Sequence, residues 1–210
     1  MSQQLKKVTY EAAINNAWDE LCAVEPDEVV RNARVTYNSD DGYYILPFLG
    51  EIYHVFPEKR KVKDSRNQDV YPFLAVLLLH YLTNAKDIEP EGKLISFREL
   101  EGGDIYYSAF CARAINKITE AFGQNPEILT EVGNRINAMK GVHGDISIII
   151  NAFPKIPVTV ILWKGDEEVP SSSNMLFDAS IAELLPTEDV AVLGGFVASN
   201  LKKTAESLQI

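Results

Sequence analysis

The sequence predicts an α+β fold, in which an antiparallel sheet made of a meander and a C-terminal hairpin packs with several helices, one of them a central apolar helix. Two blocks of sequence rich in Val, Ile and Tyr predict the strands, and helix-forming segments lie around them. The connections within each block are too short for crossovers, so the strands should be antiparallel. No linker stands out, so we expect a single α+β domain over residues 1–210, beginning with an N-terminal helical segment at residues 1–33.

The first half of the chain is expected to hold two helices, the meander and the central helix. Apolar residues at helical spacing predict an amphipathic helix within residues 9–24, and PDEVVRNA predicts a shorter helix that starts at Pro26. The pattern then changes to alternation, which predicts strands at residues 34–37, 42–46 and 51–56. The next segment, YPFLAVLLLHYL, is apolar on nearly every side, as is typical of a helix buried on most faces.

The second half is expected to begin with a short strand in KLISFREL and a long helix after Gly102–Gly103. Another helix follows at NPEILTEVGNRINAMKG. GDISIIINAF and IPVTVILW are rich in β-branched residues and are separated by PKIP, which predicts a hairpin. SNMLFD is a candidate for one more short strand, and two helices close the chain. The inward stripe of the long helix should consist of Phe110, Ala114, Ile118, Ala121 and Phe122.

Composition argues against several classes of partner. The 210 residues carry a formal net charge of −10, so a nucleic-acid backbone would be repelled on average, and the basic run EKRKVKDSR is interpreted as a solvated hairpin tip. The most apolar run has about twelve residues, fewer than a membrane span needs, and the first ten residues lack the apolar core of a signal peptide. We therefore expect a cytoplasmic protein with no nucleic-acid or membrane partner. Cys22 and Cys111 form no cluster, which argues against a Cys-bound metal, and no cofactor is identified.

Four acidic residues, Asp166, Glu167, Glu168 and Asp178, flank a predicted turn and its return strand. If the return strand pairs with the strand before it, these carboxylates could approach one another. Clustered carboxylates bind magnesium or calcium, or share a proton for acid–base chemistry. The structural alternative is that Gly165–Asp166 forms a turn, Glu167 and Glu168 are solvated, and Asp178 caps a helix that follows it.

The three histidines form no metal-binding pair on a helix, because none of them are three or four residues apart. His80 lies on the apolar helix and is interpreted either as a hydrogen-bonded core residue or as a residue lining a pocket. His143 lies in KGVHGD, where glycines would let the backbone approach a ligand. That loop leads into a strand, so it is not a phosphate-binding loop of the dinucleotide or nucleotide type.

The segment FRELEGGDIYY places Arg98 close in sequence to a helix start at Gly102–Gly103. Free backbone N–H groups at such a start can hold an anion. Asp104 favours the alternative, in which the glycines are a hinge and the acid caps the helix. No motif for a nucleophilic serine or cysteine is present, and PSSSN is interpreted as a flexible loop.

The C-terminal third carries a longer pattern: P-x-x-P, an apolar strand, W-x-G-D-E-E-[FV]-P, then L-F-D and a leucine–proline helix start. This pattern resembles the domain-of-unknown-function family numbered 3786. The residues that carry it are Pro154, Pro157, Trp163, Gly165, Asp166, Glu167, Glu168, Pro170, Leu176, Phe177 and Asp178. LLLHYL and ISFRELEGGDIYYSAF are also similar, so the resemblance covers most of the chain from about Tyr44.

The resemblance implies a protein from an uncharacterised family that occurs in anaerobic bacteria and archaea and is linked to corrinoid or one-carbon metabolism. Some relatives carry an iron–sulfur segment, and the absence of a cysteine cluster here implies that this chain lacks it. Two functions remain open. One is a binding or accessory module that holds a small molecule or a partner protein in a pocket between the apolar helix and the sheet. The other is a metal-assisted hydrolase or transferase that uses the carboxylates of the WKGDEE and LFD segments.

The residues expected to bind the ligand in the first of these functions are His80, Arg98, Tyr106, Trp163, Asp166, Glu167, Glu168 and Asp178, with Tyr44, Phe97 and Tyr107 as further lining residues. Trp163 and LFD have a second interpretation, as a core anchor and a helix cap. A structural or assembly role is the third possibility, and the oligomeric state is open.

Overall fold

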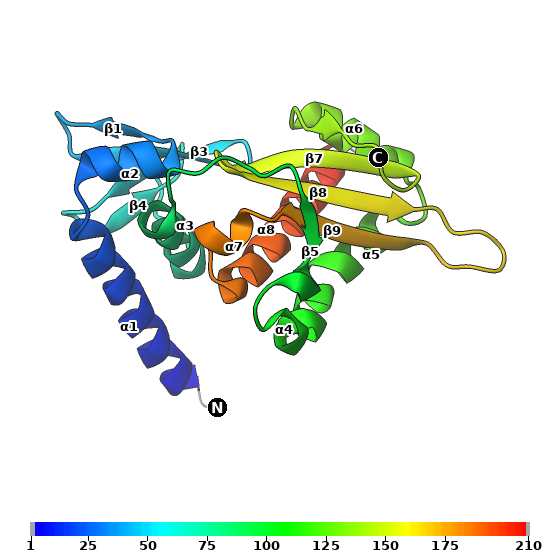
Figure 1. Ribbon diagram of the computed structural model, residues 1–210, viewed down its shortest axis with the longest axis horizontal. Helices are drawn as coiled ribbons and strands as arrows, with labels where there is room; N and C mark the ends of the chain where they lie inside the picture. The colour runs from blue at the N-terminus through cyan, green and yellow to red at the C-terminus, as the bar shows by residue number, and fades with distance from the viewer. Residues whose placement is uncertain (1–2, 209–210) are drawn as a thin grey trace. The chain divides into compact units, whose positions relative to one another are not determined.

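The computed structural model describes residues 3–208, with side chains described from residue 12 onward, and combines helices with two antiparallel sheets (Figure 1). The α+β prediction is therefore confirmed. Contacts group the chain into two compact units: unit 1 comprises Met1–Ile88 with Glu183–Leu185, and unit 2 comprises Glu89–Ala182 with Pro186–Ile210. The meander and the C-terminal hairpin lie in separate sheets, and the single domain over residues 1–210 remains a prediction.

Unit 1 contains a four-stranded antiparallel sheet and helices on either side of it in the sequence. The elements are α1 (Gln3–Cys22), α2 (Pro26–Ala33), β1 (Thr36–Asn38), β2 (Tyr43–Phe48), β3 (Glu51–Phe56), β4 (Lys61–Lys63) and α3 (Pro72–Asn84). The strands pair in the order β1-β2-β3-β4, and the first three are the predicted meander. Part of the basic run forms β4, which pairs with β3, while Lys59 and Arg60 lie exposed at the turn before it.

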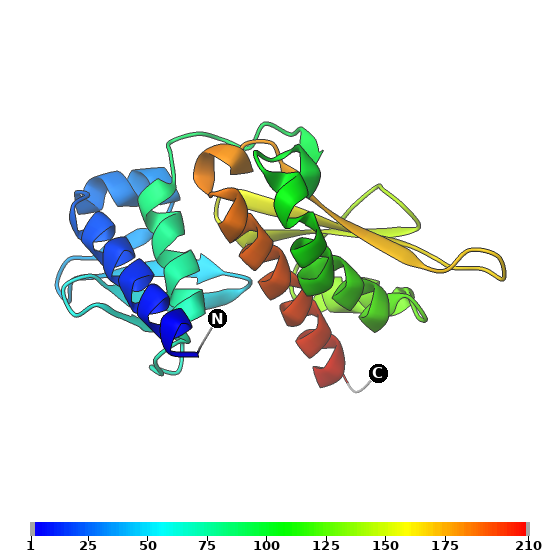
Figure 2. The same ribbon diagram turned by 90° about the horizontal axis from the view of Figure 1, so that it is seen from below.

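The apolar segment forms α3, which supplies much of the core of unit 1. Leu78 is completely buried, as are Leu79 and Tyr81. The Tyr81 hydroxyl donates a hydrogen bond of 2.8 Å to the carbonyl oxygen of Ala33 at the end of α2, so the only polar atom of this buried ring is satisfied. Helices α1 and α3 contact each other and lie side by side (Figure 2).

Unit 2 contains a five-stranded antiparallel sheet whose strand order differs from the order in the sequence. Its strands are β5 (Leu94–Ser96), β6 (Met139–Lys140), β7 (Ile146–Phe153), β8 (Ile156–Trp163) and β9 (Ser172–Asp178). They pair in the order β5-β9-β8-β7-β6. The predicted hairpin is β7–β8. SNMLFD falls within β9, which pairs with β8 so that Val158 lies opposite Phe177 at one end and Trp163 opposite Ser172 at the other.

The helices of unit 2 are α4 (Gly103–Phe110), a π-helical turn (Cys111–Ile115), α5 (Asn116–Phe122), α6 (Glu127–Arg135) and α8 (Thr187–Ser207); α7 (Ile181–Leu184) spans the boundary with unit 1. Phe110 lies at 0% exposure, with its ring stacked on Phe97 at a centroid distance of 4.3 Å and 6.1 Å from the ring of Phe177 in β9. A β-carbon at Gly194 of α8 would lie 2.6 Å from the Phe110 ring, so these helices pack closely (Figure 2). No helix in the described part of the chain is long and apolar enough to span a bilayer.

The predicted long helix is confirmed, but it is interrupted by the π-helical turn. Four residues of its predicted stripe, Phe110, Ala114, Ile118 and Phe122, are completely buried, and Ala121 is half-buried. The carbonyl oxygen of Ile115, at the end of the turn, accepts hydrogen bonds from the Thr119 hydroxyl at 3.2 Å and from the Ser173 hydroxyl of β9 at 3.0 Å. The wide turn therefore has a side-chain partner on the sheet.

Candidate functional site

The four acidic residues of the C-terminal segment do not converge. β9 pairs with β8 as expected, but Asp166, Glu167 and Glu168 lie in the exposed loop beyond one end of this pair, whereas Asp178 is the last residue of β9. The rise of a strand places the two ends of β9 about 20 Å apart. Asp166 accepts hydrogen bonds from the backbone N–H groups of Glu168 and Val169 at 2.9 and 2.7 Å, as the structural alternative predicted for a turn.

Asp178 is 3% exposed and holds together three segments of unit 2. Its carboxylate accepts backbone hydrogen bonds from Glu91 at 2.8 Å, Gly92 at 2.7 Å and Ser180 at 3.0 Å. Burial by itself would raise the pKa of Asp178, but the hydrogen bonds from Ser180, Glu91 and Gly92 lower the pKa below its ordinary value. The bond to Ser180 lies just before α7, so the predicted capping role is extended to a second segment, residues 91–92.

Arg98 lies beside the start of α4, as predicted. Its guanidinium group forms an ion pair with Asp104 at 3.1 Å and lies 4.2 Å from the centre of the Tyr107 ring. Gly102 has a φ of +69°, and a β-carbon at Gly103 would lie 2.2 Å from the carbonyl oxygen of Phe97. These glycines are therefore required by the backbone, and Asp104 already pairs with the cation that an anion would need.

The other predicted ligand-binding residues are distributed over the chain. Tyr106 is half-buried and donates a short hydrogen bond to the Glu188 carboxylate of α8. His80 is half-buried on α3 and Tyr44 is buried on β2, both in unit 1, while the remaining predicted residues belong to unit 2. Trp163, at the end of β8, is 39% exposed. The ligand-binding roles of these residues remain predictions, and no cavity within either unit is lined by all of them.

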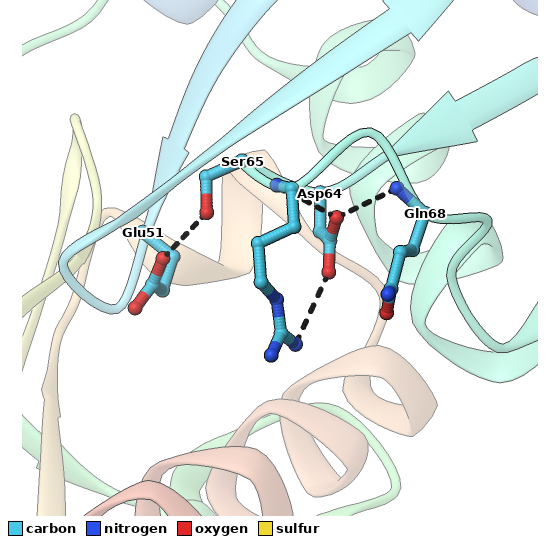
Figure 3. A network of polar contacts seen from close by, with 5 residues as sticks. Glu51, Asp64, Ser65 and Gln68 are labelled. Atoms are coloured by element: carbon cyan, nitrogen blue, oxygen red, sulfur yellow. Dashed lines mark hydrogen bonds and ion pairs between the residues drawn. The ribbon is translucent and has the colours of Figure 1, made fainter.

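The polar residues after β4 form a structural turn (Figure 3). Asp64 accepts backbone hydrogen bonds from Gln68 at 2.8 Å and Arg66 at 2.9 Å, and the bond from Gln68 is the main reason that the pKa of Asp64 is lowered. Ser65 donates to Glu51 at 3.3 Å. Across the described residues, no group of three or more His, Cys, Asp and Glu side chains is placed to hold a metal ion.

A stronger candidate site is a cavity of about 450 Å³ in unit 2, which we call the loop cavity. It lies between α6 and the loop that joins β6 to β7, the segment KGVHGD. Lys164, just after β8, completes its wall. The lining residues are Glu127, Thr130, Gly133, Asn134, Ala138, Lys140, Gly141, Val142, His143, Gly144, Asp145, Ile146, Ser147, Ile148 and Lys164.

The backbone of this loop is fixed by close packing that only glycine permits. A β-carbon at Gly141 would lie 2.4 Å from the Ser147 hydroxyl oxygen. Gly144 has a φ of +59°, and a β-carbon there would lie 2.6 Å from Ile161 and 3.4 Å from Trp163 Cε2. The glycines therefore allow the loop to approach the sheet, as the sequence suggested for KGVHGD, and Trp163 contacts the loop from the side of the sheet.

Hydrogen bonds hold every second residue of the loop. The N–H groups of Gly141 and His143 donate to Ser147, to its carbonyl oxygen at 2.8 Å and to its hydroxyl at 3.0 Å. The N–H group of Asp145 donates to the carbonyl oxygen of Leu162 at 3.1 Å. Ser147 is only 4% exposed, so the residue that anchors the loop is itself buried.

Lys164 interacts with both carboxylates of the cavity. Its ammonium group lies 2.8 Å from Glu127 Oε1, and its backbone N–H donates at 2.8 Å to Asp145 Oδ2. The hydrogen bond to Glu127 is the main cause that raises the pKa of Lys164 above its ordinary value, and the nearby charge of Asp145 acts in the same direction. The pair joins residues 37 positions apart, for which the sequence carried no signal.

A second, more open hollow of about 390 Å³ lies beside the π-helical turn and is lined by Ile115, Asn116, Thr119, Glu120 and Ser171–Ser173. The prediction of a flexible serine loop is wrong here, because Ser172 and Ser173 belong to β9. The Ser173 hydroxyl lies 2.7 Å from the Thr119 hydroxyl and bonds the Ile115 carbonyl, so these hydroxyls already satisfy one another. We therefore regard the loop cavity as the stronger candidate.

Comparison with known proteins confirms the resemblance. The model of the family described as "Domain of unknown function (DUF3786)" matches residues 25–200. This range includes every element from α2 to α7 and most of α8. No curated protein and no solved structure matches the chain.

Proposed function

Because the chain belongs to the family described as "Domain of unknown function (DUF3786)", whose description assigns no activity, we propose a function from the geometry of the site. The protein is a binding or accessory module, and unit 2 holds a small polar molecule in the loop cavity. The observation that carries this proposal is the cavity itself. Its volume of about 450 Å³ falls within the range of roughly 300–1,000 Å³ in which proteins bind small ligands.

The construction of the cavity supports binding. Its walls are a helix and a loop locked against a sheet, so its shape is set before a ligand arrives, and preorganisation lowers the entropic cost of binding. Gly133 supports the same view, because a β-carbon there would lie 2.9 Å from Ile148 and would force α6 away from the sheet.

The polar groups of the cavity favour binding over catalysis. His143 contacts Ser147 through its backbone N–H rather than through its imidazole, so the two do not form a nucleophile–base pair. The alternative of a metal-assisted hydrolase or transferase has no observation in its favour, since Asp178 lies at the opposite end of β9 from the three acids of the loop.

A link to anaerobic corrinoid or one-carbon metabolism and a cytoplasmic location form part of the proposal. The first is supported only by what the resemblance implied, and the second by Cys22 and Cys111 being free thiols.

The proposal is tested by thermal unfolding in the presence of single compounds. The set consists of inorganic phosphate, succinate, glucose and putrescine, with a cobalamin and a folate to represent corrinoid and one-carbon chemistry. A compound present at a hundred times its Kd stabilises the folded state by about 2.7 kcal/mol, which raises the Tm by about 5–10 °C in a chain of this length.

Two variants locate the binding. Thr130→Trp places a large ring on an exposed wall residue of the loop cavity, whereas Gln124→Trp adds the same ring at an exposed residue outside the lining. We expect at least one compound to stabilise the wild-type protein and Gln124→Trp but not Thr130→Trp. The proposal fails if no compound shifts the Tm, or if the shift persists in Thr130→Trp.

A further inference from the structure

We infer that the loop cavity selects a small molecule carrying an oxyanion, either a carboxylate or a phosphate, and that Lys140 is its main charged contact. This inference rests on the proposed function and specifies the chemistry of its ligand. Some polar groups of the cavity already have partners within the protein, and others do not.

Each carboxylate of the cavity already has one oxygen engaged by Lys164. Glu127 receives the ammonium group of Lys164, and Asp145 receives the backbone N–H of the same residue. A cationic ligand would have to compete with Lys164 for these carboxylates. An anionic ligand leaves both pairs intact, because it needs donors and positive charge instead.

Lys140 supplies positive charge that nothing else in the described chain neutralises. No ion pair or hydrogen bond joins its ammonium group to another described residue, whereas Lys164 has two acidic neighbours. Lys140 pairs with Ile148 across β6 and β7, and directly opposed residues of a strand pair share one face of the sheet. Ile148 is the residue that a β-carbon at Gly133 of α6 would touch, so this face is the face of the cavity.

The backbone adds donors without acceptors. The N–H groups of Gly141, His143 and Asp145 are used within the protein, but those of Val142 and Gly144 make no hydrogen bond to any described residue. Both residues line the cavity. Neighbouring backbone N–H groups in an irregular loop are a recurrent way of binding anions, and here they line the same cavity as Lys140.

The net charge of the protein sharpens the argument. A chain of net charge −10 repels anions on average, so an anion can bind only where the local charge is positive. Replacing Lys140 by Gln removes this local positive charge while keeping most of the length of the side chain. Lys140→Arg keeps the charge, and Lys202→Gln removes an exposed charge from α8, outside the lining, as the matched control.

Binding is measured by titrating inorganic phosphate and succinate separately into the full chain at low ionic strength, with isothermal calorimetry and tryptophan fluorescence. Trp163 contacts the loop and reports on it, and Trp163→Phe assigns the signal, because the other tryptophan, Trp18, is buried in unit 1. We expect Lys140→Gln to weaken binding on the order of tenfold or more, Lys140→Arg to retain it, and Lys202→Gln to leave it unchanged. A response to phosphate alone or to succinate alone identifies which oxyanion the cavity takes.

Four results would overturn the inference. Equal anion affinity in Lys140→Gln would show that Lys140 is not the contact, and an equal loss in Lys202→Gln would show only a general effect of charge. If glucose or putrescine binds and Thr130→Trp abolishes that binding, the preference for an anionic ligand is wrong, but the proposed function still stands. If none of the six compounds binds, the proposed function falls together with the inference.

Discussion

Replacement of Asp178 is the substitution whose effect follows most directly from the structure. Its two carboxylate oxygens receive three backbone N–H groups from segments that are far apart in the sequence, residues 91–92 and residue 180. Alanine removes all three acceptors. Asparagine keeps one acceptor oxygen but turns an NH₂ group toward a donor, so it restores only part of the arrangement.

The magnitude follows from the burial of each donor. Ser180 is 1% exposed, so its N–H group would be left without a partner, at a cost of about 1.5–3 kcal/mol. Glu91 and Gly92 are exposed, and water can replace the lost acceptor, which reduces the cost to about 0.5–1 kcal/mol for each. We therefore expect Asp178→Ala to lower the free energy of unfolding by about 2.5–5 kcal/mol and Asp178→Asn by somewhat less.

The assay is urea unfolding followed by far-UV circular dichroism, with hydrogen exchange of the β7–β9 amides to read unit 2 by itself, since two units need not unfold together. Asp166→Ala is the control. Asp166 also accepts two backbone N–H groups, but in an exposed loop, so its replacement should cost clearly less. If Asp178→Ala loses less than about 1 kcal/mol, or no more than Asp166→Ala, the reasoning from buried donors is wrong.

The same carboxylate predicts a dependence on pH. Its pKa is lowered in the folded state, so its contribution is complete above the ordinary value of 3.8 and is lost as the pH falls through the lower folded value. Asn does not titrate at this position. The difference in unfolding free energy between the wild-type protein and Asp178→Asn should be constant from neutral pH to about pH 5 and shrink below about pH 4. A difference that stays constant into the acid range would contradict the assignment.

Three further substitutions test the packing inside each unit, and urea unfolding measures their effect. Tyr81→Phe removes the buried hydrogen bond to the Ala33 carbonyl and should cost about 1–2 kcal/mol; no measurable loss would mean that water reaches this carbonyl. Gly103→Ala should cost about 1–3 kcal/mol, because the added carbon meets the backbone of Phe97, and a stabilised variant would show that the helix start can shift. Phe110→Ala empties a fully buried site against Phe97 and should cost about 3–5 kcal/mol; a loss below about 1 kcal/mol would show that the core collapses into the gap.

The parts of the fold that were predictable are those that depend on local periodicity. The alternation in residues 42–56 predicted strands β2 and β3, and the run around Leu78 predicted a buried helix, because these patterns are set by neighbours in the sequence. The stripe through Phe110, Ala114 and Phe122 was predicted for the same reason.

The parts that were missed depend on which strands and loops meet. The sequence could not show that the two strand blocks form separate sheets, or that β9 is long enough to keep Asp178 away from Asp166. It likewise gave no sign that Lys164 would reach Glu127 across the loop cavity. The glycines of KGVHGD were a usable signal for this cavity. Their role depends on close packing against Ser147 and Ile161, and such contacts form only when the loop folds against the sheet.

The π-helical turn at Cys111–Ile115 bears on how this helix tolerates changes in length. Its buried residues, Phe110, Ala114, Ile118 and Phe122, recur at every fourth position, and in an ordinary α-helix each such step overshoots a full turn by about 40°. The widened turn absorbs this surplus. Deleting Ala112, which is exposed, would leave steps of three, four and four, which a regular α-helix matches unaided. A deletion that would misalign most helices should therefore return this one to regular geometry with the same residues buried.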